Sequence, residues 1–145
     1  MPPSIAGLLL TPLKIVRDGR GSVMHFLRDG RAPFTCFGEV YFSTVHPGVT
    51  KGWKLHRHST SNMAVIAGAM RFWARDEREG SSTKGVTEIF DLAPVEGSYN
   101  LLTVPPGVVY AWRSTGKETA MIVNGATHPW EPDESVNLPL ETYPL

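Results

Sequence analysis

Short segments rich in β-branched and aromatic residues recur along this chain, and clusters of glycine, proline, aspartate or serine separate them. The 14 glycines and 12 prolines are spread among these segments, so uninterrupted apolar stripes of helical period are hard to find. This spacing is typical of an all-β sandwich or barrel, and we expect helix to be a minor component. The segments are SVMHFLRDG, GEVYFSTVHPG, NMAVIAGAMRFWARDEREGSS, VTEIFDLAPVEG, LLTVPPGVVYAW and TAMIVNGAT.

The length of 145 residues fits one domain, residues 1–145. A domain of this size buries about two-thirds of its unfolded surface around one core. The first residues, MPPSIAGLLLTPL, lack the positive segment of a secretory signal, and a proline interrupts their apolar run. We therefore expect them to form an early edge strand.

The charge balance and the cysteine count exclude some classes of partner. Lys+Arg and Asp+Glu both number 14, so the formal net charge is zero and no field favours nucleic acid or an anionic membrane. The single Cys36 cannot form an internal disulfide. No apolar stretch of about 18 residues is present. We expect a soluble cytoplasmic protein that binds neither nucleic acid nor membranes.

Two histidines one residue apart, His56 and His58, end the segment KGWKLHRH. If this segment is a β-strand, its period of two places Lys54, His56 and His58 on one face. Such a face is compatible with a metal site, with an acid–base site or with the solvated rim of a sheet. The segment alone leaves these alternatives open.

The next two segments predict a return strand and a buried strand. NMAVIAG is the return strand, and Gly68 permits a turn into AMRFWARD. Alternation in AMRFWARD puts Met70, Phe72 and Ala74 on a buried face and leaves the opposite face wetter.

A proline pair marks a further turn. Pro105, Pro106 and Gly107 predict a tight turn, after which Tyr110 and Trp112 share one face of a strand. We expect this strand to lie opposite the one that carries the histidines, as the other half of one cavity.

These segments resemble the two motifs of the cupin superfamily. Residues 56–68 follow its first motif, His-x-His, a later carboxylate and a glycine, with Asn62 in the carboxylate place. Residues 105–114 are similar to its second motif, Pro-x-Gly-x-x-His, with Tyr110 in the histidine place. The resemblance implies a single jelly-roll barrel.

A divalent transition metal needs three or four N, O or S donors, and a neutral amide and a phenol of pKa about 10 are poor ones. We therefore expect no catalytic metal and no other cofactor. A metal-dependent cupin enzyme with His56 and His58 as ligands remains an alternative.

A narrower resemblance covers nearly the whole chain. DGRGSVMHFLR, HPGVTKGWKLHRH, LLTVPPGVVYAW and THPWEPDE are similar, in this order, to motifs of the dTDP-4-dehydrorhamnose 3,5-epimerase family and the related dTDP-sugar ketoisomerases. The resemblance implies a homodimer that acts without metal on a nucleotide-activated 4-keto-6-deoxy sugar. It implies epimerisation or keto-isomerisation, in which a base removes a proton from the carbon next to the ketone.

The family's base histidine falls on Lys54, an arginine three residues earlier falls on Lys51, and the second histidine of the ketoisomerases falls on His56. The resemblance therefore implies Lys54 or His56 as the base. A lysine fills this role only if burial or positive charge lowers its pKa from about 10.4 toward about 7 or 8. Protonated His56 and His58 would act in that direction.

The family's acid tyrosine falls near Asn124, so the acid must come from elsewhere. Tyr110 is the candidate, because alternation turns it inward. Arg20 is implied as a diphosphate contact, since guanidinium binds phosphate in bidentate fashion. The predicted substrate-binding residues are Arg20, Lys51, His58, Asn62, Trp112 and Asn124.

The altered base and acid places also fit a cupin that binds a sugar nucleotide without chemistry. Trp53 and Trp112 could stack on the base or the sugar, although large aromatic residues in a barrel more often lie in a core or an interface. His25, His46 and His128 have no partner pattern, and we expect them to be structural or exposed.

Overall fold

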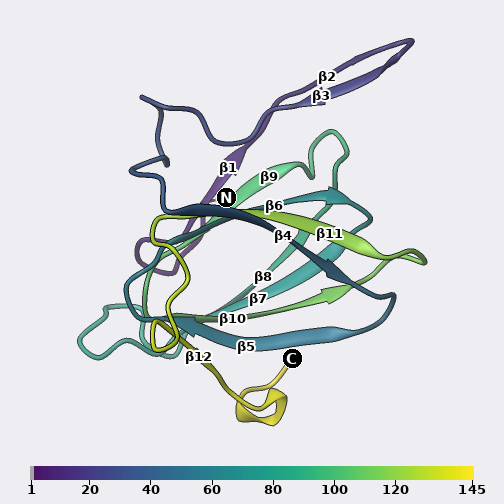
Figure 1. Cartoon of the computed structure of the whole chain (residues 1–145). Coiled ribbons are helices and arrows are strands. Elements are labelled where there is room, and N and C mark those ends of the chain that lie inside the picture. Colours follow the sequence, from purple (N-terminus) through teal and green to yellow (C-terminus); the bar gives the residue numbers. More distant parts are fainter. Residues whose placement is uncertain (1) are drawn as a thin grey trace.

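The computed structural model describes residues 2–145 as two antiparallel sheets on either side of a buried core (Figure 1). The first sheet contains, in spatial order, β1 (Leu9–Pro12), β9 (Asn100–Val104), β6 (Ser61–Ala67), β11 (Ala120–Ala126) and β4 (Glu39–Val45). The second contains β12 (Ser135–Asn137), β5 (Thr50–His56), β10 (Val108–Ser114), β7 (Met70–Asp76) and β8 (Thr87–Leu92). The only helix among residues 2–145 is the short 3₁₀ helix η1 (Leu140–Thr142). The predicted all-β class with little helix is confirmed.

The inner faces of both sheets supply one apolar core. Met70, Phe72 and Ala74 of β7 point into it, as their alternation predicted, and so do Tyr110 and Trp112 of β10. Full burial of a large apolar side chain contributes about 1.5–3 kcal/mol to the stability of the folded state. From the first sheet the core receives Val45, Met63, Val65, Leu102, Val104, Ala120 and Ile122.

The outer face of the second sheet is covered as well. A separate apolar cluster forms there, and the C-terminal segment packs against it. Its buried members are Trp53, Trp73, Val109 and Ala111, and the residues packed on them are Leu55, Leu138 and Tyr143. The expectation of a wetter second face for AMRFWARD is therefore wrong at Trp73, which is 5% exposed. Alternation defines the two faces of a strand but does not show which distant segment returns to cover one of them.

Two glycine turns predicted from the sequence are present. Gly68 has φ +70°, and a Cβ atom there would come within 2.8 Å of Ala120. Gly107 has φ +84°, and the N–H of Val108 donates to the carbonyl of Pro105 at 3.3 Å. Both positions favour glycine because residues with a Cβ rarely adopt this conformation.

The histidine strand differs from its prediction in two respects. β5 and β10 are neighbours in one sheet, with Lys54 paired to Tyr110, and so they are not opposite walls. β5 also ends at His56, and His58 lies exposed in the following loop. The predicted face of three basic side chains therefore ends at His56.

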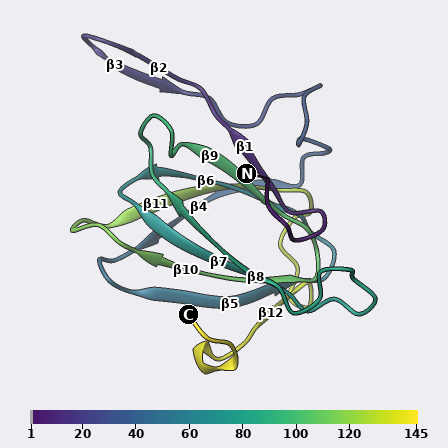
Figure 2. The same ribbon diagram turned by 180° about the vertical axis from the view of Figure 1, so that it is seen from behind.

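A hairpin of β2 (Ile15–Asp18) and β3 (Gly21–Met24) projects from the barrel (Figures 1 and 2). Val16 and Val23 on this hairpin are 44% and 61% exposed. β1, which precedes it, is an edge strand as predicted, although Met1 lies outside the described residues. Within residues 2–145, no helix has the length and hydropathy that a membrane crossing needs.

Candidate active site

A cavity of about 290 Å³ opens between the edges of the two sheets. Lys54 and His56 reach it from β5 of the second sheet, and Glu39 and Tyr41 reach it from β4 of the first. The loop between β11 and β12 closes it from the side. The other lining residues are Ser59, Ala126, His128, Trp130 and Glu134.

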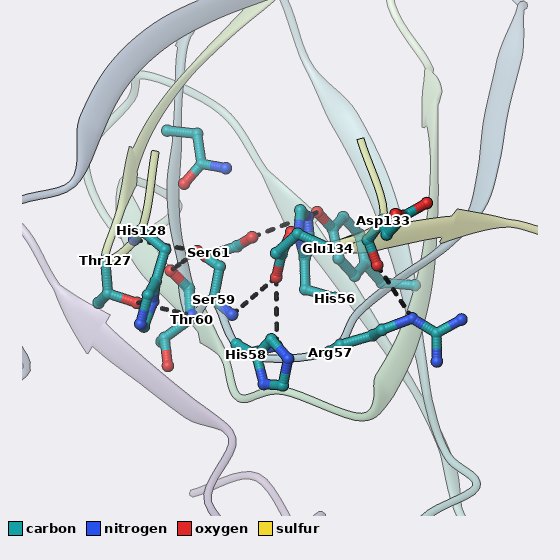
Figure 3. A network of polar contacts seen from close by, with 12 residues as sticks. His56, Arg57, His58, Ser59, Thr60, Ser61, Thr127, His128, Asp133 and Glu134 are labelled. Carbon is teal, nitrogen blue, oxygen red and sulfur yellow. Dashed lines mark hydrogen bonds and ion pairs between the residues drawn. The ribbon is translucent and has the colours of Figure 1, made fainter. Parts of the chain in front are cut away.

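His56 and Glu134 form a buried pair in this cavity (Figure 3), with Nδ1 of the imidazole 2.6 Å from Oε2 of the carboxylate. Burial lowers the pKa of His56, and the opposing effect of Glu134 is smaller. Burial opposes ionisation of Glu134, yet hydrogen bonds from His56 and from the N–H groups of Ser59 and His58 hold the carboxyl pKa below its ordinary value. The pair is therefore a neutral imidazole that donates from Nδ1 to a carboxylate.

The other imidazole nitrogen faces the barrel interior. Nε2 of His56 lies 3.1 Å from the hydroxyl of Tyr110, which lies 3.3 Å from Oγ of Ser61. Burial raises the pKa of Tyr110 far above its ordinary value, so its hydroxyl stays protonated and donates a hydrogen bond to Nε2. Tyr110 is buried in the core and does not line the cavity.

Lys54 is the only lysine or arginine on the wall of this cavity among the described residues. Its side chain is half-buried, and its ammonium makes no hydrogen bond or ion pair with any of residues 2–145. Burial lowers the pKa of Lys54, while the charges of Glu134 and Glu39 act in the opposite direction. A half-buried lysine with a lowered pKa loses its proton at a lower pH than an exposed lysine and can then act as a base.

Tyr41 is the only phenol on the wall of this cavity among residues 2–145, and it was not predicted from the sequence. Its oxygen accepts a hydrogen bond of 2.8 Å from Nδ2 of Asn124, whose Oδ1 accepts one of 3.0 Å from the N–H of Asn62. Burial raises the pKa of Tyr41, so the phenol stays protonated near neutral pH. Because Asn124 is already the donor in this contact, the O–H of Tyr41 is left to donate into the cavity.

Comparison with known proteins identifies the arrangement. A dTDP sugar isomerase from Desulfovibrio desulfuricans G20 has the same fold with a TM-score of 0.92 and is 34% identical to this chain. The match covers 95% of this chain and 87% of that protein.

The chain belongs to the dTDP-sugar isomerase family. The spore coat polysaccharide biosynthesis protein SpsL of Bacillus subtilis is 28% identical over 130 residues, which are 90% of this chain and 85% of that protein. A dTDP-4-dehydrorhamnose 3,5-epimerase from Sulfolobus tokodaii shares the fold with a TM-score of 0.83 at 20% identity, over 100% of this chain and 86% of that one. No model of a known protein family matches the chain. The predicted jelly-roll cupin fold is thus confirmed.

The predicted site residues fall into two groups, those at or directly behind the cavity wall and those away from it. Lys54 and His56 line the cavity, whereas Asn124 is buried behind Tyr41 and Asn62 is buried behind Asn124. Tyr110 lies one contact further in, behind His56.

The other predicted binding residues lie away from the cavity of their own chain. The ammonium of Lys51 donates to the carbonyl of Thr44 at 2.7 Å on the surface. Trp112 is part of the core and stacks on Tyr110 with 5.5 Å between the ring centroids. His58 is exposed after β5, and Arg20 lies on the projecting hairpin of Figure 1.

The sequence resemblance missed the carboxylates of Glu39 and Glu134 and the rim residues His128 and Trp130. Glu134 ends the segment THPWEPDE. This segment carries part of the family resemblance, but the resemblance implied no role for any residue in it. His128 is exposed, as expected, but it lies on the cavity rim. Strand alternation in GEVYFSTV could have put Glu39 and Tyr41 on one face, but not opposite Lys54.

The donors that the metal-dependent alternative would use do not converge. His58 turns away from the cavity, and both ring nitrogens of His56 have hydrogen-bond partners. Within residues 2–145, no three His, Cys, Asp or Glu side chains come together in a way that could hold a metal ion.

Proposed function

We propose that this protein catalyses metal-independent epimerisation or keto-isomerisation of a dTDP-linked 4-keto-6-deoxy sugar. One arrangement supports the proposal above all others. The amine of Lys54 and the hydroxyl of Tyr41 line the same cavity in a chain of the dTDP-sugar isomerase family. A base and a proton donor around one small cavity are what carbon-acid chemistry next to a ketone requires.

In the proposed reaction Lys54 is the base. Its burial favours the neutral amine, because desolvation lowers the pKa of the ammonium. The amine takes a proton from the carbon next to the ketone, and the electron pair of that C–H bond moves to the ketone oxygen as the enolate forms.

In the same reaction, the hydroxyl of Tyr41 is the hydrogen-bond and proton donor. It approaches from β4, whereas Lys54 approaches from β5, so the two groups reach the sugar from different sheets. A hydrogen bond from its O–H stabilises the developing oxyanion. In epimerisation, Tyr41 protonates the opposite face of the same carbon and the ketone re-forms. In keto-isomerisation, the enolate oxygen takes a proton to give an enediol; the former ketone carbon is then protonated, and the hydroxyl on the neighbouring carbon loses its proton to become the new ketone.

His56 is the second candidate base. Its Nε2 already accepts a hydrogen bond from Tyr110, so the imidazole must break this contact before it can accept a substrate proton. In the assignment that we favour, Lys54 is the base and Glu134, paired with His56, supplies a negative charge near it. This charge stabilises the ammonium that forms when Lys54 takes the substrate proton.

The nucleotide is assigned to the rim of the cavity. Trp130 is 65% exposed there and offers an aromatic face on which a base can stack. The β2–β3 hairpin, whose turn contains Arg20, projects from the barrel (Figure 1), and Arg20 does not line the cavity of its own chain, so we assign its diphosphate contact to the cavity of a second copy in a homodimer. The exposed Val16 and Val23 supply apolar surface for that assembly.

Solvent exchange tests the proposal directly. We expect the protein to incorporate deuterium from D₂O into dTDP-4-keto-6-deoxyglucose at a carbon next to the ketone, as read by mass spectrometry and NMR. Incubation of the sugar nucleotide without protein measures the background. Exchange at the background rate would overturn the assignment of catalysis.

Binding without exchange supports the alternative function, a non-catalytic sugar-nucleotide-binding cupin. This alternative is favoured by Lys54 and Asn124 at the places that the resemblance gives to the family's base and acid. Calorimetric titration with dTDP separates it from a protein that does not bind the nucleotide at all. The cytoplasmic location, the one-domain organisation over residues 1–145 and the lack of a nucleic acid partner remain predictions from the sequence.

A further inference from the structure

Trp53, which the sequence allows as a stacking residue, is buried on the side of the second sheet that faces away from the core. The C-terminal segment packs on Trp53 and passes beside β5 on the outside of the barrel (Figures 1 and 2).

Glu134 is fixed from the cavity side by its carboxylate and its carbonyl. Oε1 accepts hydrogen bonds from the N–H groups of Ser59 at 2.7 Å and His58 at 3.2 Å, and Oε2 contacts His56 (Figure 3). The carbonyl of Glu134 accepts from the N–H of Arg57 at 2.8 Å. Each of these contacts requires the chain to lie alongside the end of β5.

The chain on either side of Glu134 has few contacts: before it, the carbonyl of Asp133 accepts from Nε of Arg57 at 3.1 Å, and that of Glu131 accepts from the N–H of Glu134 at 3.2 Å. Residues 128–133, which precede it, are all exposed. β12, which follows it, has only three residues, paired as Ser135 with His56, Val136 with Leu55 and Asn137 with Lys54. An edge strand this short is weak unless the chain beyond it is anchored.

The anchor beyond β12 is centred on Trp53. The backbone groups of Trp53 and Leu138 exchange hydrogen bonds of 3.1 and 2.8 Å, and the indole Nε1–H donates to the carbonyl of Leu140 at 3.1 Å. Tyr143 then meets the Trp53 ring edge-on, with 5.4 Å between centroids. The guanidinium of Arg75 lies 4.9 Å from the centre of the Tyr143 ring.

We propose that Trp53 and Tyr143 are positioning residues that hold β12 in register and thereby hold the Glu134 carboxylate against His56 in the cavity. Residues 138–143 then belong to the functional site although none of them lines the cavity. The structural part of this proposal is independent of the proposed function, whereas its effect on reaction rate rests on it.

Two variants in the full-length chain separate anchoring from packing. Trp53→Phe keeps an aromatic ring in the outer cluster but removes the N–H that reaches Leu140. Trp73→Phe is the matched control, because it removes an indole from the same cluster without touching that hydrogen bond. Tyr143→Ala removes the second part of the anchor at a position that is only half-buried.

Amide hydrogen exchange of Ser59 and His58, followed by NMR, measures the placement of Glu134 without any substrate. Loss of one hydrogen bond in Trp53→Phe, or of one edge-on aromatic contact in Tyr143→Ala, weakens the anchor by an amount that corresponds to about a two- to tenfold change in an opening equilibrium. We expect the Ser59 amide to exchange faster by about that factor in Trp53→Phe and Tyr143→Ala, and not in Trp73→Phe. Equal acceleration in both tryptophan variants, or none in Trp53→Phe and Tyr143→Ala, would overturn the proposal.

The kinetic readout is the split between kcat and KM for dTDP-4-keto-6-deoxyglucose. We expect Trp53→Phe to lower kcat by about two- to tenfold with KM unchanged, because a displaced Glu134 no longer fixes His56 or stabilises the ammonium of Lys54 that forms during proton transfer. A raised KM with unchanged kcat contradicts this effect on rate. If the amide exchange changes as expected while no variant or parent protein shows turnover, the anchoring stands and the proposed function fails.

Discussion

The side-chain amide of Asn124 donates a hydrogen bond of 2.8 Å to the hydroxyl of Tyr41. The two residues are paired across β11 and β4, where Asn124 lies directly opposite Tyr41. Asn124 occupies the place that the resemblance gives to an acid tyrosine, and it orients a different tyrosine toward the cavity. A phenol therefore lines this cavity from the strand next to Asn124.

Replacement of Tyr41 tests this relationship. We expect Tyr41→Phe to slow deuterium incorporation into dTDP-4-keto-6-deoxyglucose by about 100-fold, because the reaction loses its general acid. Tyr110→Phe is the comparison, since Tyr110 does not line the cavity and acts only through His56. If Tyr110→Phe has the larger effect, Tyr110 rather than Tyr41 is the acid.

Lys54 is expected to be essential for proton abstraction. Lys54→Met keeps the length of the side chain but removes the amine, and we expect exchange to fall by about 100-fold or more. Lys117→Met is the control, because Lys117 is exposed on the turn between β10 and β11. Full exchange in Lys54→Met combined with its loss in His56→Gln would assign the base to His56.

The contacts of Glu134 predict a pH-dependent contribution to stability. The pKa of the folded-state carboxyl lies below its ordinary value, so the ionised form stabilises the fold above about pH 4.3, and this is lost as pH falls through the folded-state pKa. We expect Glu134→Gln to lower the free energy of unfolding at pH 6 by about 1–3 kcal/mol and by less at pH 3.

Urea unfolding of both proteins at the two pH values gives this difference, and the exposed Glu118→Gln serves as the control. A loss of the same size at pH 3 and pH 6 would show that the carboxylate charge is not what stabilises the fold.

Metal removal should leave the reaction unchanged. Both ring nitrogens of His56 have hydrogen-bond partners, and no third metal-binding side chain joins His56 and Glu134 within residues 2–145. We therefore expect far less than one equivalent of transition metal in protein purified without a histidine tag. Deuterium exchange should proceed at the same rate after EDTA treatment. Near-stoichiometric metal together with loss of exchange in EDTA would favour the metal-dependent alternative.

The projecting hairpin predicts an assembly and a nucleotide contact that can be separated. We expect light scattering to give the mass of a dimer, and Val23→Asp to shift it toward a monomer because a charge enters an apolar interface. Arg20→Ala should keep the dimer and weaken dTDP binding by about tenfold. Arg71→Ala is the control, since Arg71 pairs with Asp91 on the surface as Arg20 pairs with Asp18, but it lies on β7 and not on the hairpin. Unchanged dTDP affinity in Arg20→Ala would remove Arg20 from the site.

Local pattern was sufficient to predict part of the site. Alternation along β5 put Lys54 and His56 on one face, and the two motifs indicated a cupin barrel. The same alternation failed at His58, because the strand ends before it. The role of Glu134 could not be predicted by alternation, since it reaches His56 from 78 residues further along the chain.

The sequence by itself determined the all-β class, the glycine turns and the core-facing sides of β7 and β10, because these depend on backbone preferences and on a period of two within a few residues. Only the tertiary structure decided that Tyr41, Glu39 and Glu134 line the same cavity as Lys54. Sheet pairing and the return of the C-terminal segment bring Tyr41 and Glu134 to the cavity, and contacts of that kind form between strands whose own patterns do not encode their partners.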